Sequence, residues 1–444
     1  MTMRGKRVAV VGAGAAGLSA ALALREGGAE PVVFEAAEKP GGKIGTVPEG
    51  GFLAEDGPTA LVAGASTAHG LAAKLGLAPE IRDARARAAR YVFTRGRLHA
   101  APSLGLFSAG GWTRAALEPF WPGRPGPDGS LHDYLVSRLG RQAGALAAGV
   151  MARGVYAGDP ERLSAQEAFP SLGAISRDHR SLLLGALAAG RASRGKPKPR
   201  PGLWSFAGGL SALVRAMAGR LGERLRLATP VVSLAPEGAG FRVGWDGAAP
   251  GEGSFESVIL ALPAFAAANL CRGFAPGLAG ALGAIPYAPV AVVHLGVKDS
   301  QLARPAAGFG LIDGDGTLGM LGALFPGWLF PGRAPEGCAL LTAMVGGVRR
   351  PQVVDASDAG LVELARAALG RALGLAGDPV FTRVVRHARA IPQIEVGHAA
   401  RVKAVEKEAA RFPSLALCGA AYHGVSVDSA LIDGGVTAAR LLKG

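Results

Sequence analysis

The sequence predicts an α/β protein that begins with a Rossmann-like βαβ unit. An apolar run at Arg7–Val11 leads directly into Gly12, Gly14 and Gly17, which complete a G-x-G-x-x-G motif. A segment of helix-forming composition follows, and the next apolar run ends at Glu35. The chain has 444 residues, enough for two or three domains, and its 49% hydrophobic and 18% charged residues are typical of a globular protein.

Each position of this motif has a task in binding a dinucleotide. Gly12 permits a tight turn, Gly14 lets the backbone approach a pyrophosphate, and Gly17 lets the helix pack closely on the strand. The start of the helix offers free N–H groups and the positive end of its dipole to the phosphates. Glu35 lies eighteen residues after Gly17, where it can accept hydrogen bonds from a ribose diol and would repel a 2′-phosphate. The motif therefore predicts dinucleotide binding.

Two glycine-rich loops indicate that the dinucleotide is FAD. The stretch EKPGGKIGT follows closely after Glu35, and EDGPTAL occupies Glu55–Leu61. A flavin must pass through the protein so that its ring reaches a second domain, and such loops can line that path. The sequence contains no second G-x-G-x-x-G between a strand and a helix, so we expect no nicotinamide site. This combination indicates an oxidase or a quinone-linked dehydrogenase.

Composition argues against several other classes of protein. The net charge of +14 would suit nucleic acid, an anionic membrane surface or an acidic substrate. Aromatic residues are sparse and RNP-like or zinc-finger patterns are missing, so we expect no nucleic-acid partner. Cys271, Cys338 and Cys418 are far apart and the histidines lack ligand spacing, so we expect neither disulfides nor a metal. Proline and glycine interrupt the long uncharged stretches, which predicts buried core rather than transmembrane helices.

The middle of the chain changes character several times. Residues 130–192 have a largely helical composition, and a basic, proline-containing linker follows at Arg191–Gly202. We expect this linker to be a solvated surface loop, with contact to anionic lipid as the alternative. A helical pattern after two glycines at 205–221 and two strand-like runs at 227–245 suggest that the chain then returns to the nucleotide domain.

These segments together resemble the oxygen-dependent protoporphyrinogen oxidases, a family within the flavin amine oxidase superfamily. The resemblance runs nearly end to end. It rests on the G-x-G-x-x-G start with Glu35 and GGK, on EDGP, RGVYAGDPERLSAQEAFPSL, SFAGGL and GFGLI, and on CGAAYHGVSVDSAL near the C-terminus. The stretch Arg153–Leu172 is the most specific, because general amine oxidases are not expected to share it.

The resemblance implies a Rossmann-like FAD-binding domain, a mixed-sheet substrate domain and a helical, membrane-facing domain. The FAD-binding domain would combine residues 1–91, 205–265 and 396–444. Residues 92–204 would form the helical domain and residues 266–395 the substrate domain. The resemblance further implies a cytoplasmic protein that contacts the cytoplasmic face of the inner membrane peripherally, and it is compatible with a homodimer.

The resemblance also assigns cofactor residues. Cys418 does not match the cysteine of covalently flavinylated amine oxidases, so we expect noncovalent FAD. The C-terminal motif would be the second half of the flavin site, with its backbone against the flavin and the following helix, LIDGGVTAARLL, aimed at the polar edge of the ring. The implied cofactor positions are Gly12, Ala13, Gly14, Ala15, Ala16, Gly17, Glu35, Ala36, Lys43, Gly57, Pro58, Thr59, Ala60, Val231, Ala420, Val425, Ser426 and Val427.

The implied substrate is a porphyrinogen, a flexible tetrapyrrole that carries propionate groups. Arg90 matches the position of an arginine that pairs with a propionate, a role that suits a guanidinium. Without that match, Arg90 would be interpreted as one of several surface arginines. Phe309, Ile312 and Met344 match positions that line the tetrapyrrole pocket, although Leu311–Ile312 departs from the common pattern.

The implied activity is the six-electron oxidation of protoporphyrinogen IX to protoporphyrin IX, with O2 as acceptor and H2O2 released. No catalytic acid–base pair stands out in the sequence. We interpret His423 as a loop histidine in preference to a proton acceptor. Three alternatives stay open. They are oxidation of coproporphyrinogen III to coproporphyrin III, an amine or carotenoid oxidoreductase on the same fold, and a catalytically silent FAD protein acting as a membrane scaffold.

Overall fold

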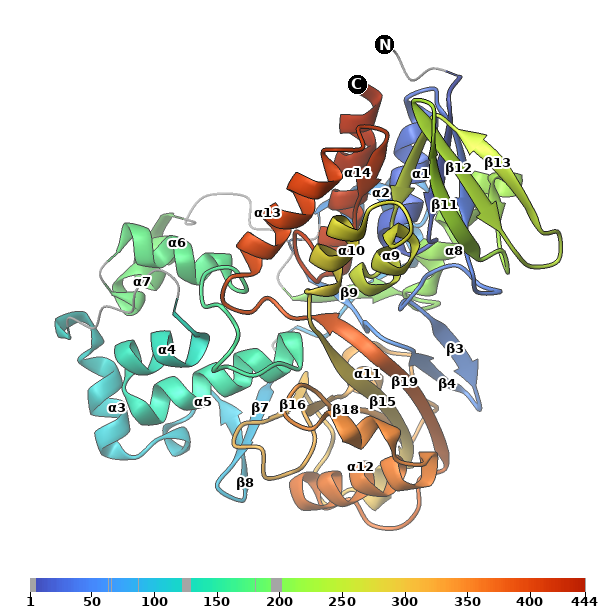
Figure 1. Cartoon of the computed structure of the whole chain (residues 1–444). Coiled ribbons are helices and arrows are strands. Elements are labelled where there is room, and N and C mark those ends of the chain that lie inside the picture. The colour runs from blue at the N-terminus through green and yellow to red at the C-terminus, as the bar shows by residue number, and fades with distance from the viewer. Residues whose placement is uncertain are drawn as a thin grey trace.

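The structure is a computed structural model that describes residues 5–62, 64, 66–86, 88–121, 129–179, 181–192 and 202–443. Figure 1 shows three parts: a nucleotide unit with both chain ends at the top, a unit built on a large sheet below it, and a helical segment at the left. Residues 193–201 of the predicted linker lie outside the described residues.

The nucleotide unit is built on a parallel five-stranded sheet of order β10–β2–β1–β14–β20. Its strands are β1 (Arg7–Val11), β2 (Glu30–Phe34), β10 (Leu225–Arg226), β14 (Ser257–Leu260) and β20 (Leu415–Leu417). The predicted strand, helix and strand at the N-terminus are confirmed, with α1 at Ala15–Glu26. Because β14 and β20 extend the same sheet, distant parts of the chain complete one nucleotide unit.

Apolar side chains cover both faces of this sheet, as expected for parallel strands. On one face Val8, Val10 and Val33 pack against helices. These helices are α1, α2 (Ser66–Lys74), α8 (Ser211–Leu221) and α14 (Val427–Lys443). The opposite face packs against β11 (Val231–Glu237), β12 (Gly240–Trp245), β13 (Gly251–Phe255), α9 (Ala264–Cys271), α10 (Pro276–Gly283) and α13 (His398–Ala409). Residues 264–283 therefore join the core of the nucleotide unit, although the sequence predicts that the substrate domain begins at residue 266.

The sheet unit contains a seven-stranded sheet of order β19–β15–β18–β17–β16–β7–β8. Its strands are β7 (Arg90–Thr94), β8 (Arg97–Ala101), β15 (Tyr287–Lys298), β16 (Gly310–Asp313), β17 (Gly322–Leu324), β18 (Cys338–Gly346) and β19 (Phe381–Pro392). β7 and β16 run parallel and the other neighbours run antiparallel, which confirms a mixed sheet. Helix α12 (Asp358–Leu373) packs on one face of this sheet, and the short helix α11 (Pro326–Leu329) precedes β18.

One predicted domain boundary falls inside a strand. The sequence predicts a change from the FAD-binding domain to the helical domain between residues 91 and 92, whereas β7 spans Arg90–Thr94. β7 and β8 both belong to the sheet unit, because the backbone groups of β7 pair with β16 and β8. β16 lies more than 200 residues further along the chain, so local sequence gives no sign of this pairing.

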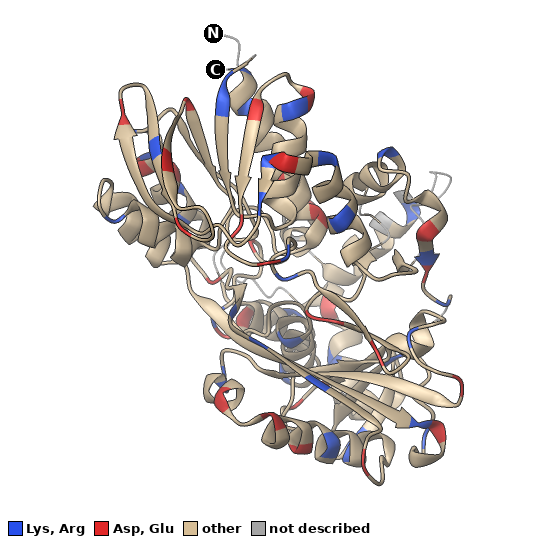
Figure 2. Ribbon diagram, turned by 90° about the vertical axis from the view of Figure 1, so that its right-hand side faces the viewer, with Lys and Arg blue, Asp and Glu red and all other residues tan. Residues whose placement is uncertain are grey.

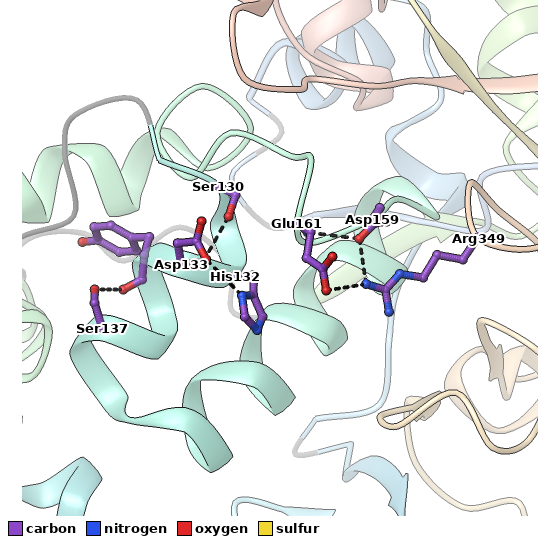
Figure 3. A network of polar contacts seen from close by, with 8 residues as sticks. Ser130, His132, Asp133, Ser137, Asp159, Glu161 and Arg349 are labelled. Atoms are coloured by element: carbon purple, nitrogen blue, oxygen red, sulfur yellow. Dashed lines mark hydrogen bonds and ion pairs between the residues drawn. The ribbon is translucent and has the colours of Figure 1, made fainter.

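Helices form most of the segment between residues 109 and 192, as predicted for residues 130–192. They are α3 (Ala109–Ala116), α4 (Leu131–Leu139), α5 (Arg141–Met151), α6 (Pro170–Asp178) and α7 (Leu182–Ala192), and a π-helical turn at Ala152–Tyr156 continues α5. In the described part of the chain, every helix falls short of the length and apolarity that crossing a bilayer would need. Arg349 of the sheet unit forms ion pairs with Asp159 and Glu161 of this segment (Figure 3).

Five short strands form two further small sheets. They are β3 (Thr46–Glu49), β4 (Phe52–Glu55), β5 (Leu61–Val62), β6 (Ile81–Asp83) and β9 (Leu203–Phe206). Figure 2 shows lysine and arginine spread over the nucleotide and sheet units, with acidic residues between them. The described part of the positive charge is therefore not gathered on a single element.

Candidate active site

Two of the three glycines of the G-x-G-x-x-G turn stand where a side chain would not fit. Gly12 has a φ of +103°, and a Cβ there would lie 2.7 Å from the carbonyl oxygen of Ala261. A Cβ on Gly17 would clash with the carbonyl oxygen of Gly12. The first and third glycines therefore let strand β1, the turn and helix α1 approach one another, as the motif predicts.

The N-terminus of α1 is open to a ligand. Gly14 is its N-cap and provides no side-chain hydrogen bond, and a Cβ on Gly14 would meet nothing within 4 Å. The first helical residues, Ala15 and Ala16, are buried. Free N–H groups at a helix N-terminus, combined with open space in front of a glycine, suit a pyrophosphate.

Glu35 lies at the end of β2, next to this turn. Its carboxylate accepts hydrogen bonds from the backbone N–H groups of Ala13 (2.7 Å) and Ala37 (3.0 Å). The Thr229 N–H donates to the Glu35 carbonyl at 2.8 Å, so the start of β11 at Val231 lies nearby. Two donors leave lone pairs on the carboxylate that a ribose diol can use.

The two glycine-rich loops pack against this turn and against each other. Gly41 forms a bridge with Gly14, and its N–H donates to the Ala13 carbonyl at 2.9 Å. A Cβ on Gly57 would clash with the carbonyl oxygen of Lys43, so the second loop needs glycine where it touches the first. Burial lowers the pKa of the Lys43 ammonium.

The second loop continues through Pro58 and Ala60 and contains an unusual hydroxyl. Thr59 is buried, and its Oγ1 has no hydrogen-bond partner within the described residues. Buried polar atoms normally have a hydrogen-bond partner, so a buried hydroxyl without one is a candidate ligand contact. The open helix start, the glycine contacts and this hydroxyl together fit a dinucleotide that continues from the phosphate turn into the second loop.

The C-terminal helix closes the nucleotide unit against α1. A Cβ on Gly434 would clash with the backbone of Ala16, and the Ser19 hydroxyl donates to the Leu431 carbonyl at 2.7 Å. The sequence predicts that this helix begins at Leu431, whereas it begins at Val427, because the Ser426 hydroxyl accepts the Ser429 N–H at 3.0 Å and caps it. Helices from the two ends of the chain are therefore in direct contact.

Asp433 organises the loop that precedes this helix. Its Oδ2 accepts the Gly419 N–H at 2.6 Å, and its Oδ1 lies 2.8 Å from Nδ1 of His423. This hydrogen bond raises the pKa of His423. The Asp433 carboxylate therefore ties both sides of Ala420 to α14 and gives His423 a structural role in the loop.

Strand register brings the predicted substrate residues onto one face of the seven-stranded sheet. Ile312 of β16 lies opposite Gly322 of β17, which lies opposite Met344 of β18. Arg90 of β7 lies opposite Gly310, two residues before Ile312. Residues directly opposite one another share a face, as do residues two apart on a strand. Arg90, Ile312 and Met344 therefore lie on the same face.

That face is turned toward the second glycine-rich loop. His294 of β15 lies opposite Thr342, in the strand row that also includes Gly310. His294 Nε2 donates to the Glu55 carbonyl at 3.0 Å, and Arg383 of β19 pairs with Asp56 at 2.8 Å. Burial lowers the pKa of His294 to about 4, which keeps the ring neutral so that Nδ1 can accept from Thr342.

Arg90 begins β7 and lies next to Phe309, the residue directly before β16. The Arg90 guanidinium carbon lies 5.2 Å from the centre of the Phe309 ring. Arg90 is exposed, whereas Phe309, Ile312 and Met344 are only partly buried. Ile312 also packs close to Gly154 of the helical segment. A cation above an aromatic ring and beside accessible apolar side chains can receive a ligand with an anionic edge and an apolar body.

The fold and this site define a class of protein. Residues 15–442 match the flavin containing amine oxidoreductase family, and the chain belongs to that family. It is an oxidoreductase with a flavin cofactor.

The similar proteins are more specific. The chain is 33% identical to the protoporphyrinogen oxidase of Bos taurus, over 99% of this chain and 98% of that protein. It is 28% identical to the coproporphyrinogen III oxidase of Bacillus subtilis (strain 168), over 97% and 96% of the two chains. Its fold matches a putative protoporphyrinogen oxidase from Exiguobacterium sp. 255-15 with a TM-score of 0.85, at 23% identity and 99% coverage of both chains. A reduced UDP-galactopyranose mutase shares the fold at a TM-score of 0.75, with 15% identity and coverage of 99% and 96%.

Sequence reasoning missed four residues that hold the site together. Asp433 and Glu55 belong to motifs quoted above. An acidic residue close to glycines in such a motif is the signal that could have identified them. His294 and Arg333 carry no local signal, because each contacts Glu55 from a distant strand or loop.

Proposed function

We propose that this oxidoreductase binds FAD noncovalently and oxidises protoporphyrinogen IX to protoporphyrin IX in heme biosynthesis. The reaction removes six electrons in three rounds, consumes three O2 and releases three H2O2. FAD, when bound, supplies the hydride acceptor and passes the electrons to O2. Similarity to protoporphyrinogen oxidases over nearly the whole chain supports this substrate class.

The shared sheet face of Arg90, Ile312 and Met344 is the observation that carries the proposal. Arg90 binds a propionate through its guanidinium fork. Phe309, Ile312 and Met344 enclose the macrocycle and exclude water from the reacting carbon. His423 is committed to Asp433, so the proposal gives it no catalytic task.

A comparison of two substrates tests the proposal. Purified protein is incubated aerobically with protoporphyrinogen IX or with coproporphyrinogen III, and porphyrin fluorescence and H2O2 are followed. We expect faster turnover of protoporphyrinogen, because only one cation, Arg90, is assigned to a propionate. If neither substrate produced fluorescence in yellow, flavin-loaded protein, the proposal would be wrong and a silent flavoprotein would be favoured.

Oxidation of coproporphyrinogen III is the second candidate. The Bacillus subtilis relative and the net charge of +14 favour it, since this substrate carries four carboxylates. A higher kcat/KM with coproporphyrinogen in the same assay would select it.

We also propose that the helical segment attaches the protein to the cytoplasmic face of a membrane. Phe120 is 83% exposed and Leu187 is 59% exposed, and α7 packs against the turn that contains Phe120. Exposed apolar clusters of this kind mark interaction surfaces. Co-sedimentation with anionic vesicles should fall in the double variant Phe120→Ser/Leu187→Ser, and unchanged co-sedimentation would contradict the proposal. A homodimer stays a prediction for size-exclusion chromatography.

A further inference from the structure

A buried ion pair joins the sheet unit to the nucleotide unit beside the second glycine-rich loop. Arg333 follows α11, and Glu55 ends β4 immediately before Asp56 and Gly57. Each residue is 2% exposed, and Arg333 Nη1 lies 2.7 Å from Glu55 Oε1. Burying two charges is costly unless further hydrogen bonds satisfy both groups, so their other partners decide what the pair does.

Both oxygens of the Glu55 carboxylate accept further hydrogen bonds. Oε1 also accepts the Leu210 N–H at 3.0 Å, and Oε2 accepts the Thr46 hydroxyl at 2.6 Å. Gly209 has a φ of +78°, and a Cβ there would lie 2.8 Å from Glu55 Oε1. The second glycine of the SFAGGL motif therefore lets the start of α8 reach this carboxylate.

The other arm of the guanidinium reaches the far end of the loop. Arg333 Nη2 donates to the Ser205 hydroxyl at 2.8 Å, and that hydroxyl donates to the Thr59 carbonyl at 3.4 Å. Glu55 and Thr59 stand on either side of Gly57 and Pro58. A single guanidinium thus fixes both ends of the loop 55–59, directly at Glu55 and through Ser205 at Thr59.

We propose that Arg333 is a positioning residue that sets the geometry of the loop 55–59 against the flavin and links this geometry to the sheet that carries the substrate residues. The inference rests on the proposed function, because it takes FAD as the ligand of this loop. Lysine cannot replace arginine here, since one ammonium cannot span Glu55 and Ser205 as the planar fork does.

The test compares three variants that each disturb a buried polar contact. Ser205→Ala removes the bridge to Thr59 and leaves the ion pair intact, and Arg333→Lys removes the fork. Ser181→Ala is the matched control. Ser181 is also a fully buried serine, but its hydroxyl donates to Glu118 in the helical segment. Apo-protein of each variant is titrated with FAD, and flavin fluorescence gives the Kd.

We expect the Kd for FAD to rise about tenfold in Ser205→Ala and Arg333→Lys, the change expected for one lost hydrogen bond in a buried site. The flavin midpoint potential should shift in the same two variants. Ser181→Ala should lower the thermal midpoint of the apo-protein and leave the Kd and the potential unchanged.

Wild-type Kd and potential in Ser205→Ala and Arg333→Lys, with only a lower thermal midpoint, would show a purely structural role and overturn the inference. If Arg333→Lys does not fold, Ser205→Ala decides by itself. Failure of the wild-type protein to bind FAD would refute the proposed function, and this result is distinct from either variant outcome.

Discussion

Single residues determine how closely backbone segments approach in the site. Gly12, Gly17 and Gly57 stand where a Cβ would meet a backbone oxygen. The charged residues of the site differ in exposure. Arg90 is exposed on the sheet face that carries the substrate residues, whereas Glu55 and Arg333 are buried. The exposed charge is accessible to a ligand, and the buried pair is bound to partners within the protein.

Removing the exposed charge should weaken substrate binding. We expect Arg90→Ala to raise KM for the porphyrinogen about tenfold or more with a smaller change in kcat, since a charge-assisted hydrogen bond contributes about 1.5–3 kcal/mol. Steady-state kinetics measure this effect. Arg97→Ala, at the exposed start of β8, is the control and should behave as wild type. Equal KM values in both variants would exclude a carboxylate role for Arg90.

The buried His294 should make the protein less stable in acid. Its pKa is about 4 in the folded state against about 6.5 when unfolded, so below pH 6.5 the unfolded chain binds a proton that the folded chain rejects. Stability should fall between pH 6.5 and pH 4, by up to about 3 kcal/mol from this residue, and His294 should add no pH dependence above pH 6.5.

Denaturant unfolding at several pH values measures this slope. His294→Gln can keep both hydrogen bonds without titrating and should flatten the slope. Burial also lowers the pKa of His398 to about 4, so a double variant with His398→Gln should be flatter still. If His294→Gln showed the same dependence of stability on pH as the wild type, His294 would not be the group that causes it.

At the scale of elements, two helices from opposite ends of the chain form a close contact in the nucleotide unit. α14 approaches α1 closely because Gly434 faces the backbone of Ala16. The neighbouring Gly435 is different, since a Cβ there would lie 3.7 Å from the Ser19 hydroxyl oxygen. Two adjacent glycines of one helix therefore provide a matched pair for mutation.

Alanine at these positions should have opposite effects. Gly434→Ala should destabilise the protein by about 1–3 kcal/mol and weaken FAD retention, because the two helices must separate. Gly435→Ala fits without a clash and should stabilise the protein by about 0.5–1 kcal/mol through helix propensity. Thermal unfolding and flavin content after gel filtration measure both effects. Similar behaviour of the two variants would contradict the close contact.

The elements also show the limits of prediction from the sequence. The βαβ unit was predicted correctly because each strand and helix is marked by a local pattern. The boundary at residue 91 falls inside β7, and α9 and α10 join the nucleotide unit, because both outcomes depend on partners far along the chain.

At the scale of the whole molecule, the nucleotide sheet combines strands from the N-terminus, the middle and the C-terminus. Unfolding any one of these segments removes strands from a shared core, so the unit should unfold cooperatively. Contacts of Glu55 and Asp56 with His294, Arg333 and Arg383 connect it to the sheet unit.

Adding FAD should therefore raise the thermal midpoint of one transition. At 100 times the Kd, linkage contributes about 2.7 kcal/mol. NADP+ is the control and should not stabilise the protein, because Glu35 repels a 2′-phosphate. Calorimetry showing two transitions, of which only one responds to FAD, would contradict this cooperative coupling.

The sequence by itself determined the dinucleotide turn, the acid that follows it, the glycine-rich loops and the family, because these features are short patterns whose steric and electrostatic reasons are local. Only the tertiary structure decided that Arg90, Ile312 and Met344 share a sheet face, and that Glu55, Ser205 and Arg333 meet behind one loop. Strand register and burial create these contacts between residues up to 278 positions apart. The local sequence around each residue does not indicate which distant residue it will contact.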